Sequence, residues 1–174
     1  MIKLTSDEVD AIRHGLTTEL MTQVQERYRS TLKKLRDRII GKGAFELFID
    51  GAADLHTKRA GIGGVIFRDG NELYTFSEYL DNATNNEAEY QALITGVRSA
   101  WDLNIKVIRI KSDSELIVKQ INGQYKVKHP NMVPLYKQAI SLLNKFDSWS
   151  LSHVPREENK VADKLSKDGL KAND

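Results

Sequence analysis

The order of strand-like and helix-like periods from residue 45 onward is the feature that most constrains this fold. Three successive segments carry the apolar pattern of strands, with no helical segment between them. These segments are residues 45–51, 61–67 and 72–80. Three consecutive strands predict an antiparallel meander. The Asp69-Gly70 pair supplies the positive φ values that a tight hairpin turn needs between the second and third strands.

Two further strand segments follow, and helical segments separate them. The expected strands are residues 106–111 and 148–153, and the expected helices are residues 84–102, 114–121, 133–146 and 157–170. Strands separated by helices join a sheet in parallel through right-handed crossovers. The pattern therefore predicts an α/β domain with a mixed sheet of five strands, the first three antiparallel, and with helices flanking the sheet.

Residues 1–43 have a different pattern. Their apolar residues recur every three or four positions, which predicts a helix from about residue 6 to residue 40. Gly41 and Gly43 mark its end. We therefore divide the chain into an N-terminal helical extension, 1–43, and a globular domain, 44–174. The apolar stripe of the helix needs a cover, which is the globular domain, a second copy of the chain in a short coiled coil, or a protein partner.

Composition excludes several classes of protein. The 174 residues include no cysteine, which excludes disulfides, thiolate metal sites and a cysteine nucleophile. No apolar run approaches the ~18 residues of a membrane helix, and the N-terminus lacks the apolar core of a signal peptide. We expect a soluble, cytoplasmic protein without a membrane partner. The formal net charge of +2 leaves nucleic acid open as a partner.

Four carboxylates fall where α/β proteins gather their ligands. Asp50 and Asp113 end the first and fourth strands, Glu89 lies in the first turns of a helix, and Asp163 lies in the last helix. Taken singly, Asp113 could cap a helix and Asp163 could be a solvated helix residue. Four converging acids without nearby cations would repel one another unless they held a divalent cation. Oxygen ligands favour Mg²⁺ or Mn²⁺, and two such ions catalyse phosphodiester cleavage.

Four sequence blocks carry these acids in a recognisable order. The blocks are Ile49-Asp50-Gly51-Ala52, Thr84-Asn85-Asn86-Glu87-Ala88-Glu89, Ser112-Asp113-Ser114-Glu115 and HVPREENKVAD from His153 to Asp163. Together they resemble ribonuclease H type 1, in its compact bacterial, archaeal and plant-type branch, over residues 45–170. The resemblance implies a sheet ordered 3-2-1-4-5. It also implies an endonuclease that hydrolyses the RNA strand of RNA–DNA hybrids with two Mg²⁺ ions, or Mn²⁺ as a substitute, leaving 5′-phosphate and 3′-hydroxyl ends.

The resemblance also implies roles for individual residues. The catalytic, metal-binding set falls on Asp50, Glu89, Asp113 and Asp163. Glu87 is turned away from Glu89 by its helical offset and is expected to face solvent. His153, on a flexible loop before the last helix, matches a proton shuttle or product-release aid, because imidazole exchanges protons near neutral pH. The alternative for His153 is a loop residue bonded to the backbone.

Positions near the substrate follow from the same blocks. They are Gly51, Thr84, Asn85, Asn86, Glu115, Asn131 and Asn159. Thr84 and Asn131 match a pocket for a DNA phosphate, and Asn159 bonds either a catalytic carboxylate or the substrate. Ordinary N-capping is the alternative for Asn85 and Asn86.

One departure from the family concerns the segment that binds the hybrid. Some members carry a long basic insertion with tryptophan after the short helix, and here only residues 123–130 occupy that region. Basic residues between Arg27 and Lys42 offer a substitute, although we favour a solvated helix face as the explanation of these charges. The alternatives to the proposed activity are another nuclease of the same superfold and a non-catalytic module that binds nucleic acid or a protein partner.

Overall fold

The computed structural model describes residues 25–29, 31, 45–54 and 56–172. The chain divides into two compact units, Met1–Gly43 and Ala44–Asp174. In the first unit, residues 26–29 and residue 31 are helical, as expected there. The rest of the expected N-terminal helix, its apolar stripe and the cover of that stripe lie outside the described residues. No helix among the described residues is long and apolar enough to span a bilayer.

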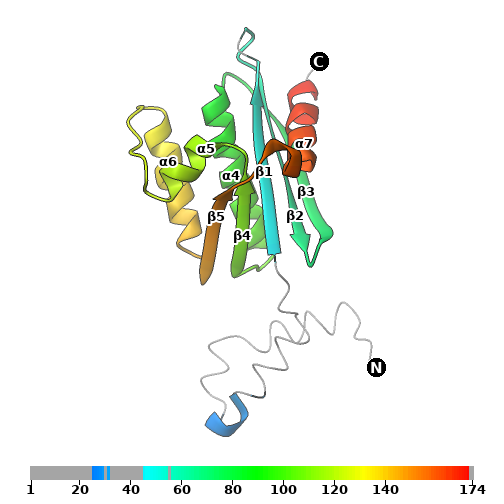
Figure 1. Cartoon of the computed structure of the whole chain (residues 1–174), viewed down its shortest axis with the longest axis vertical. Coiled ribbons are helices and arrows are strands. Elements are labelled where there is room, and N and C mark those ends of the chain that lie inside the picture. Colours follow the sequence, from blue (N-terminus) through cyan, green and yellow to red (C-terminus); the bar gives the residue numbers. More distant parts are fainter. Residues whose placement is uncertain (1–24, 30, 32–44, 55, 173–174) are drawn as a thin grey trace. The chain divides into compact units, whose positions relative to one another are not determined.

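The second unit is built on a five-stranded sheet in the order β3-β2-β1-β4-β5 (Figure 1). The strands are β1 (Phe45–Ala53), β2 (Ala60–Arg68), β3 (Asn71–Leu80), β4 (Val107–Ser112) and β5 (Ser148–His153). The β1–β2 and β2–β3 pairs are antiparallel, while β4 runs parallel to β1 and β5 parallel to β4. The predicted sheet order and strand directions are confirmed. Asp69 and Gly70 have φ values of 53° and 80°, as the predicted hairpin turn requires.

The helices connect the parallel strands and cover the sheet. They are α4 (Asn85–Asp102), α5 (Glu115–Ile121), α6 (Met132–Leu143), the 3₁₀ turn η1 (Arg156–Glu158) and α7 (Lys160–Lys171). Two predicted boundaries are wrong. The last helix begins at Lys160, not at residue 157, because a tight turn through η1 first brings Asn159 inward. The helix expected to reach residue 146 ends at Leu143. The amides of Lys145 and Phe146 bond the carbonyls of Leu142 and Leu143, which forms a turn before β5.

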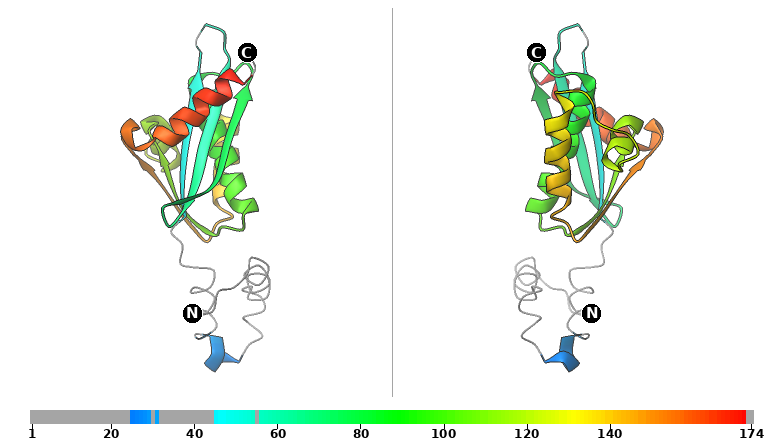
Figure 2. Two further views of the ribbon diagram at one scale, coloured as in Figure 1. Left: turned by 90° about the vertical axis from the view of Figure 1, so that its right-hand side faces the viewer. Right: turned by 90° about the vertical axis from the view of Figure 1, so that its left-hand side faces the viewer.

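The sheet is covered by α4 on one face and by α7 on the other, and α6 packs against α4 (Figure 2). Along β1, Leu47 and Ile49 contact α4 at Gly96 and are fully buried. Asp50, the residue after Ile49, points to the opposite face, where α7 lies, because side chains alternate along a strand. Gly61 and Gly63 of β2 lie directly beneath α7, and a Cβ atom at either would overlap the backbone at Ser166. Glycine on β2 thus lets α7 approach the sheet closely enough to reach Asp50.

Candidate active site

The pairing of β1 with β4 brings Asp50 and Asp113 together. The prediction that Asp50 ends the first strand is wrong, because β1 continues to Ala53 through its pairing with β2. The two strands are parallel neighbours, and Ile49 pairs with Ser112. The residues that follow this pair, Asp50 and Asp113, therefore lie next to each other. Asp50 is 5% exposed and accepts a hydrogen bond from the Ser166 hydroxyl on α7. The short distance between α7 and β2 therefore determines how Asp50 is oriented.

Glu89 reaches the same edge from α4. An added Cβ atom at Gly51 would overlap the backbone at Ala88 and Glu89, so only glycine allows α4 this close to β1. The amide of Gly51 donates a hydrogen bond to the Glu89 carboxylate. Gly51 is buried and its amide is used internally, which makes it a support for Glu89 and leaves its predicted substrate contact without structural support.

The ligand atoms of Asp50, Glu89 and Asp113 lie within 4.8 Å of one another. Burial, followed by repulsion from Asp50 and Asp113, raises the pKa of Glu89 to about 9. Burial is also the largest cause that raises the pKa of Asp50 to about 6, against the hydrogen bond from Ser166. The Oε2 atom of Glu89 is buried without a hydrogen-bond partner among the described residues. These three side chains form an acidic cluster, called the carboxylate trio below. All three are carboxylates, so the trio contains no positive charge of its own.

Asn159 holds the third member of the trio in place. Its Nδ2 donates to Asp113 Oδ1 at 2.8 Å and to the carbonyl of Ile49 at 2.9 Å. Asn159 is 1% exposed. Of the two predicted alternatives, the structure therefore gives the bond to a carboxylate, and burial leaves no surface for a substrate. Asp113 does not cap α5, because the N-cap of that helix is Ser114, and among the described residues no side chain caps the helix end.

Asp163 lies close enough to the trio to raise the pKa of Asp50, but it is engaged elsewhere. Arg156 donates to its Oδ1 from Nη2 at 2.5 Å, and Lys167 donates to its Oδ2 at 2.6 Å. Partial burial favours a higher pKa for Asp163, but the bonds from Lys167 and Arg156 outweigh it and lower the pKa. The expectation of four acids without nearby cations is therefore wrong: Asp163 is ion-paired with Arg156 and Lys167, and the charge of Arg156 also reaches Asp50 and Glu89.

His153 is the last residue of β5 and pairs in register with Ser112. This is the end of the predicted strand 148–153, and not the loop position that the resemblance implied for His153. Its exposed ring places Nε2 at 3.2 Å from the carbonyl oxygen of Asp113. The ring is thus at the rim of the trio, in contact with the backbone of one of its members.

The N-terminus of α4 gathers a second group of predicted residues. Thr84 is the N-cap, and Glu87 completes a capping box with it. Asn85 and Asn86 are exposed in the first turn, so the N-capping alternative for them is excluded. The Glu87 carboxylate accepts from the Thr84 hydroxyl at 2.8 Å and from Nδ2 of Asn131 at 3.1 Å. Glu87 is therefore half-buried and bonded, not simply solvent-facing, and it joins the two residues predicted to form a phosphate pocket.

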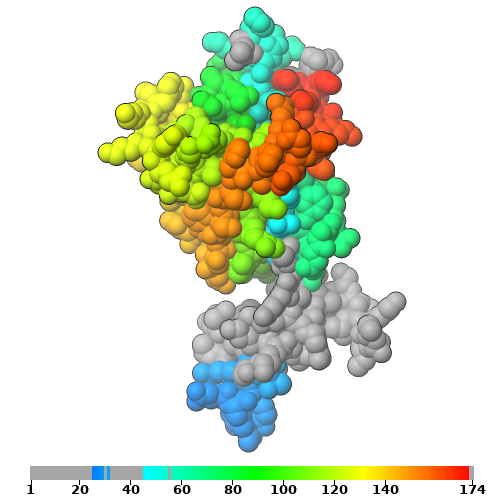
Figure 3. All heavy atoms as spheres, viewed as in Figure 1, coloured from blue at the N-terminus to red at the C-terminus, as the bar shows by residue number. Residues whose placement is uncertain are grey.

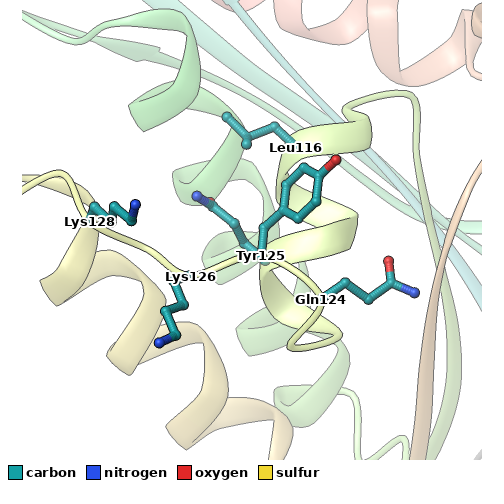
Figure 4. A pocket seen from close by; sticks show the side chains of 6 residues that line it. Leu116, Gln124, Tyr125, Lys126 and Lys128 are labelled. Carbon is teal, nitrogen blue, oxygen red and sulfur yellow. The ribbon is translucent and has the colours of Figure 1, made fainter.

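The exposed Glu115 begins α5 and forms an ion pair with Lys119 at 2.6 Å. Beyond it, the short loop after α5 borders an open pocket of about 430 Å³ (Figure 4). Its lining residues are Leu116, Gln120, Gln124, Tyr125, Lys126 and Lys128. The pocket carries two lysines and an exposed tyrosine where some members of the resembled family have a longer basic insertion.

Asn159 was predicted from the sequence, but three other positioning residues of the site were not. They are Ser166, which orients Asp50, and Arg156 and Lys167, which bind Asp163. Lys167 stands four residues after Asp163, and that i,i+4 spacing is a readable signal. No spacing rule connects Ser166 with Asp50, because that bond depends on how α7 crosses the sheet.

The comparison with known proteins agrees with this geometry. Residues 48–169 match the family model described as reverse transcriptase-like. The structure superposes on ribonuclease H1 from Halobacterium salinarum with a TM-score of 0.72 and 35% identity, over 74% of this chain and 98% of that chain. The chain belongs to the ribonuclease H type 1 family.

Two other structures resemble this ribonuclease H domain. The N-terminal RNase H domain of Rv2228c from Mycobacterium tuberculosis has 34% identity and a TM-score of 0.72, over 75% of this chain and 95% of that chain. LC11-RNase H1, solved in complex with an RNA/DNA hybrid, has 32% identity and a TM-score of 0.70, over 74% of this chain and 98% of that chain. The chain spans 65% of the full Halobacterium Ribonuclease HI and 34% of the bifunctional protein Rv2228c.

Proposed function

We propose that this chain is a metal-dependent endonuclease that hydrolyses the RNA strand of RNA–DNA hybrids, with two Mg²⁺ ions or Mn²⁺ in their place. The products of this reaction are 5′-phosphate and 3′-hydroxyl ends. The observation that carries the proposal is the convergence of Asp50, Glu89 and Asp113 in a domain of the ribonuclease H type 1 family. The complex of the LC11 relative with an RNA/DNA hybrid supports the class of substrate.

The carboxylate trio fits a hard divalent cation. Its donors are all oxygen, and one of them, Glu89 Oε2, is buried with no partner among the described residues. The raised pKa values of Glu89 and Asp50 mean that the trio resists holding its full negative charge without a cation. Asp50, Glu89 and Asp113 would hold the first ion, and Asp50 with Asp163 would hold the second.

The bound ions supply positive charge that makes water more acidic and stabilises the charge that develops on the phosphate and the leaving oxygen. The residues of the chain orient the groups that take part. Ser166 fixes the Asp50 carboxylate, and Asn159 fixes Asp113. His153 places Nε2 at the rim of the trio, 3.2 Å from the carbonyl oxygen of Asp113, where the imidazole would transfer a proton to the leaving oxygen.

The substrate-facing roles fall on the exposed side of α4 and α5. Recognition of a hybrid requires contacts to the 2′-hydroxyls of one strand and to the phosphates of the other. We assign the 2′-hydroxyl contacts to Asn85, Asn86 and Glu115. We assign a phosphate of the DNA strand to Thr84 and Asn131. Both side chains donate to the Glu87 carboxylate, so a phosphate would have to replace Glu87 as their acceptor.

Cleavage of one labelled RNA strand in three forms tests the proposal: in an RNA–DNA hybrid, in an RNA duplex and alone. We expect cleavage of the hybrid only, in Mg²⁺ or Mn²⁺, and none in EDTA. Asp113→Asn removes one charge from the trio and is expected to lower the rate at least ~100-fold. End-labelling of the fragments checks the product ends.

Asp168→Asn is the matched control. It makes the same substitution at an exposed position of α7, beyond Ser166 and Lys167, and is expected to retain the wild-type rate. Equal rates for Asp113→Asn and Asp168→Asn would contradict the assignment of the trio. A folded wild-type protein that cleaves no hybrid in either metal would contradict the proposed function.

A further inference from the structure

Asp163 differs from the carboxylate trio because both of its oxygens already bind cations of the chain. Its Oδ1 accepts from Nη2 and Nε of Arg156, at 2.5 and 3.2 Å. Its Oδ2 accepts from Lys167 at 2.6 Å. A divalent ion that used Asp163 as a ligand would have to compete with these donors.

The charge of Arg156 also acts on the trio. Burial and mutual repulsion raise the pKa values of Asp50 and Glu89, and the positive charge of Arg156 opposes that rise in both. The guanidinium therefore contributes part of the compensation that a second divalent ion would contribute. The guanidinium exerts this effect from its position on the Asp163 carboxylate.

The Arg156 side chain can leave this position without disturbing the backbone. It is 67% exposed, against 17% for Asp163, and an exposed ion pair is only weakly favourable. The backbone around it is held separately, since the amide of Asn159 bonds the carbonyl of Arg156 and the Asn159 side chain is buried against β1 and β4. In Figure 3 the segment of η1 and the start of α7, in orange, lies at the surface beside α5.

We infer that Arg156 is an internal counter-cation that occupies the Asp163 carboxylate in place of the second divalent ion. Binding of that ion requires the guanidinium to leave Asp163. Once released, the guanidinium is free to bind a phosphate oxygen of the substrate. Arg156 is thus a positioning residue that acts through Asp163, and this inference rests on the proposed two-ion function.

Titration of the full chain with Mn²⁺ alone, followed by calorimetry and by the electron paramagnetic resonance of bound Mn²⁺, tests the inference without substrate. The wild type is expected to bind one ion at the trio and a second more weakly. Arg156→Gln is expected to tighten the second ion on the order of fivefold and to tighten the first by a smaller factor, because the charge of Arg156 also reaches Asp50 and Glu89. Arg156→Lys, which keeps the charge but loses the second hydrogen bond, should fall between them.

Arg109→Gln removes one positive charge from an exposed pair with Glu46 on the sheet and should leave both affinities unchanged. Lys167→Gln frees the other oxygen of Asp163 and should tighten the second ion in the same direction, which keeps the test valid if Arg156→Gln fails to fold. A second-ion affinity that is unchanged or weaker in the folded variants would overturn the inference, as would a wild type that binds no Mn²⁺. Hybrid cleavage by the wild type is scored separately, so a protein that binds the ions as expected but cleaves nothing refutes the proposed function alone.

Discussion

At the residue scale, Glu89 is the carboxyl group whose ionisation the fold opposes most strongly. Its carboxylate is 6% exposed beside two other acids, and its pKa is raised to about 9. In the unfolded chain the same group titrates near its ordinary value of 4.5. Between these two pH values the folded state binds more protons than the unfolded state, so the free energy of unfolding falls as the pH rises. Asp50, raised to about 6, adds to this fall at lower pH.

Glu89→Gln should therefore stabilise the metal-free protein, and more so at pH 8 than at pH 5. Glutamine keeps the shape of the protonated carboxyl group but cannot ionise. The gain between the two pH values is expected to be on the order of 2–4 kcal/mol, since each unit of pKa shift corresponds to 1.36 kcal/mol. Urea unfolding in EDTA at the two pH values measures it. The same comparison with saturating Mg²⁺ should reverse in sign, and a pH-independent difference would contradict the raised pKa.

Asn159 offers a second prediction at this scale. Asn159→Ala removes the donor to Asp113 and to the Ile49 carbonyl and should lower the free energy of unfolding by about 1–3 kcal/mol. Asn159→Asp should cost more at neutral pH than at pH 4, because it places a second carboxylate against Asp113. Urea denaturation of both variants at the two pH values checks this. If the aspartate variant were as stable as wild type at neutral pH, the contact with Asp113 would be wrong.

At the scale of elements, the close packing of α7 against β2 determines the position of Ser166, which bonds Asp50. Gly63→Ala would push a methyl group into the backbone at Ser166, and α7 would have to move. We expect a loss of stability of about 2–3 kcal/mol together with a lower rate of hybrid cleavage, because Ser166 and Asp163 both travel with the helix. Gly70→Ala at the hairpin turn is the control. It meets no atom within 4 Å, so its cost should be the ~1 kcal/mol of its positive φ, with an unchanged rate.

The same elements show what the sequence could and could not predict. Period and turn residues were enough to place every strand of the sheet within two residues, because alternation and the Asp69-Gly70 turn are local properties. The trio could also be anticipated, since strand ends and a helix N-terminus converge in any fold of this topology. The ion pair of Asp163 with Arg156 could not be predicted, because it depends on the η1 turn. That turn replaces the first helical residues expected at 157–159 and exists because Asn159 bonds into the sheet.

At the scale of the whole molecule, the question is whether residues 44–174 suffice. Among the described residues, the apolar core runs from Leu47 to Leu151 and the trio with its supports runs from Asp50 to Lys167, all within the second compact unit. Residues 44–174 alone should therefore unfold cooperatively within about 3 °C of the full chain and cleave hybrid with the same kcat, as calorimetry and steady-state kinetics would show.

The salt dependence of KM then separates the two explanations of the basic residues between Arg27 and Lys42. A solvated helix face leaves the slope of log KM against log salt unchanged on deletion. If those residues bind the hybrid, deletion should make the slope shallower by about 0.9 for each phosphate that they neutralise. We expect the unchanged slope, because the described domain carries its own predicted phosphate-binding residues at Thr84 and Asn131. A loss of cooperative unfolding in the shortened chain would show instead that the extension is part of the folding unit.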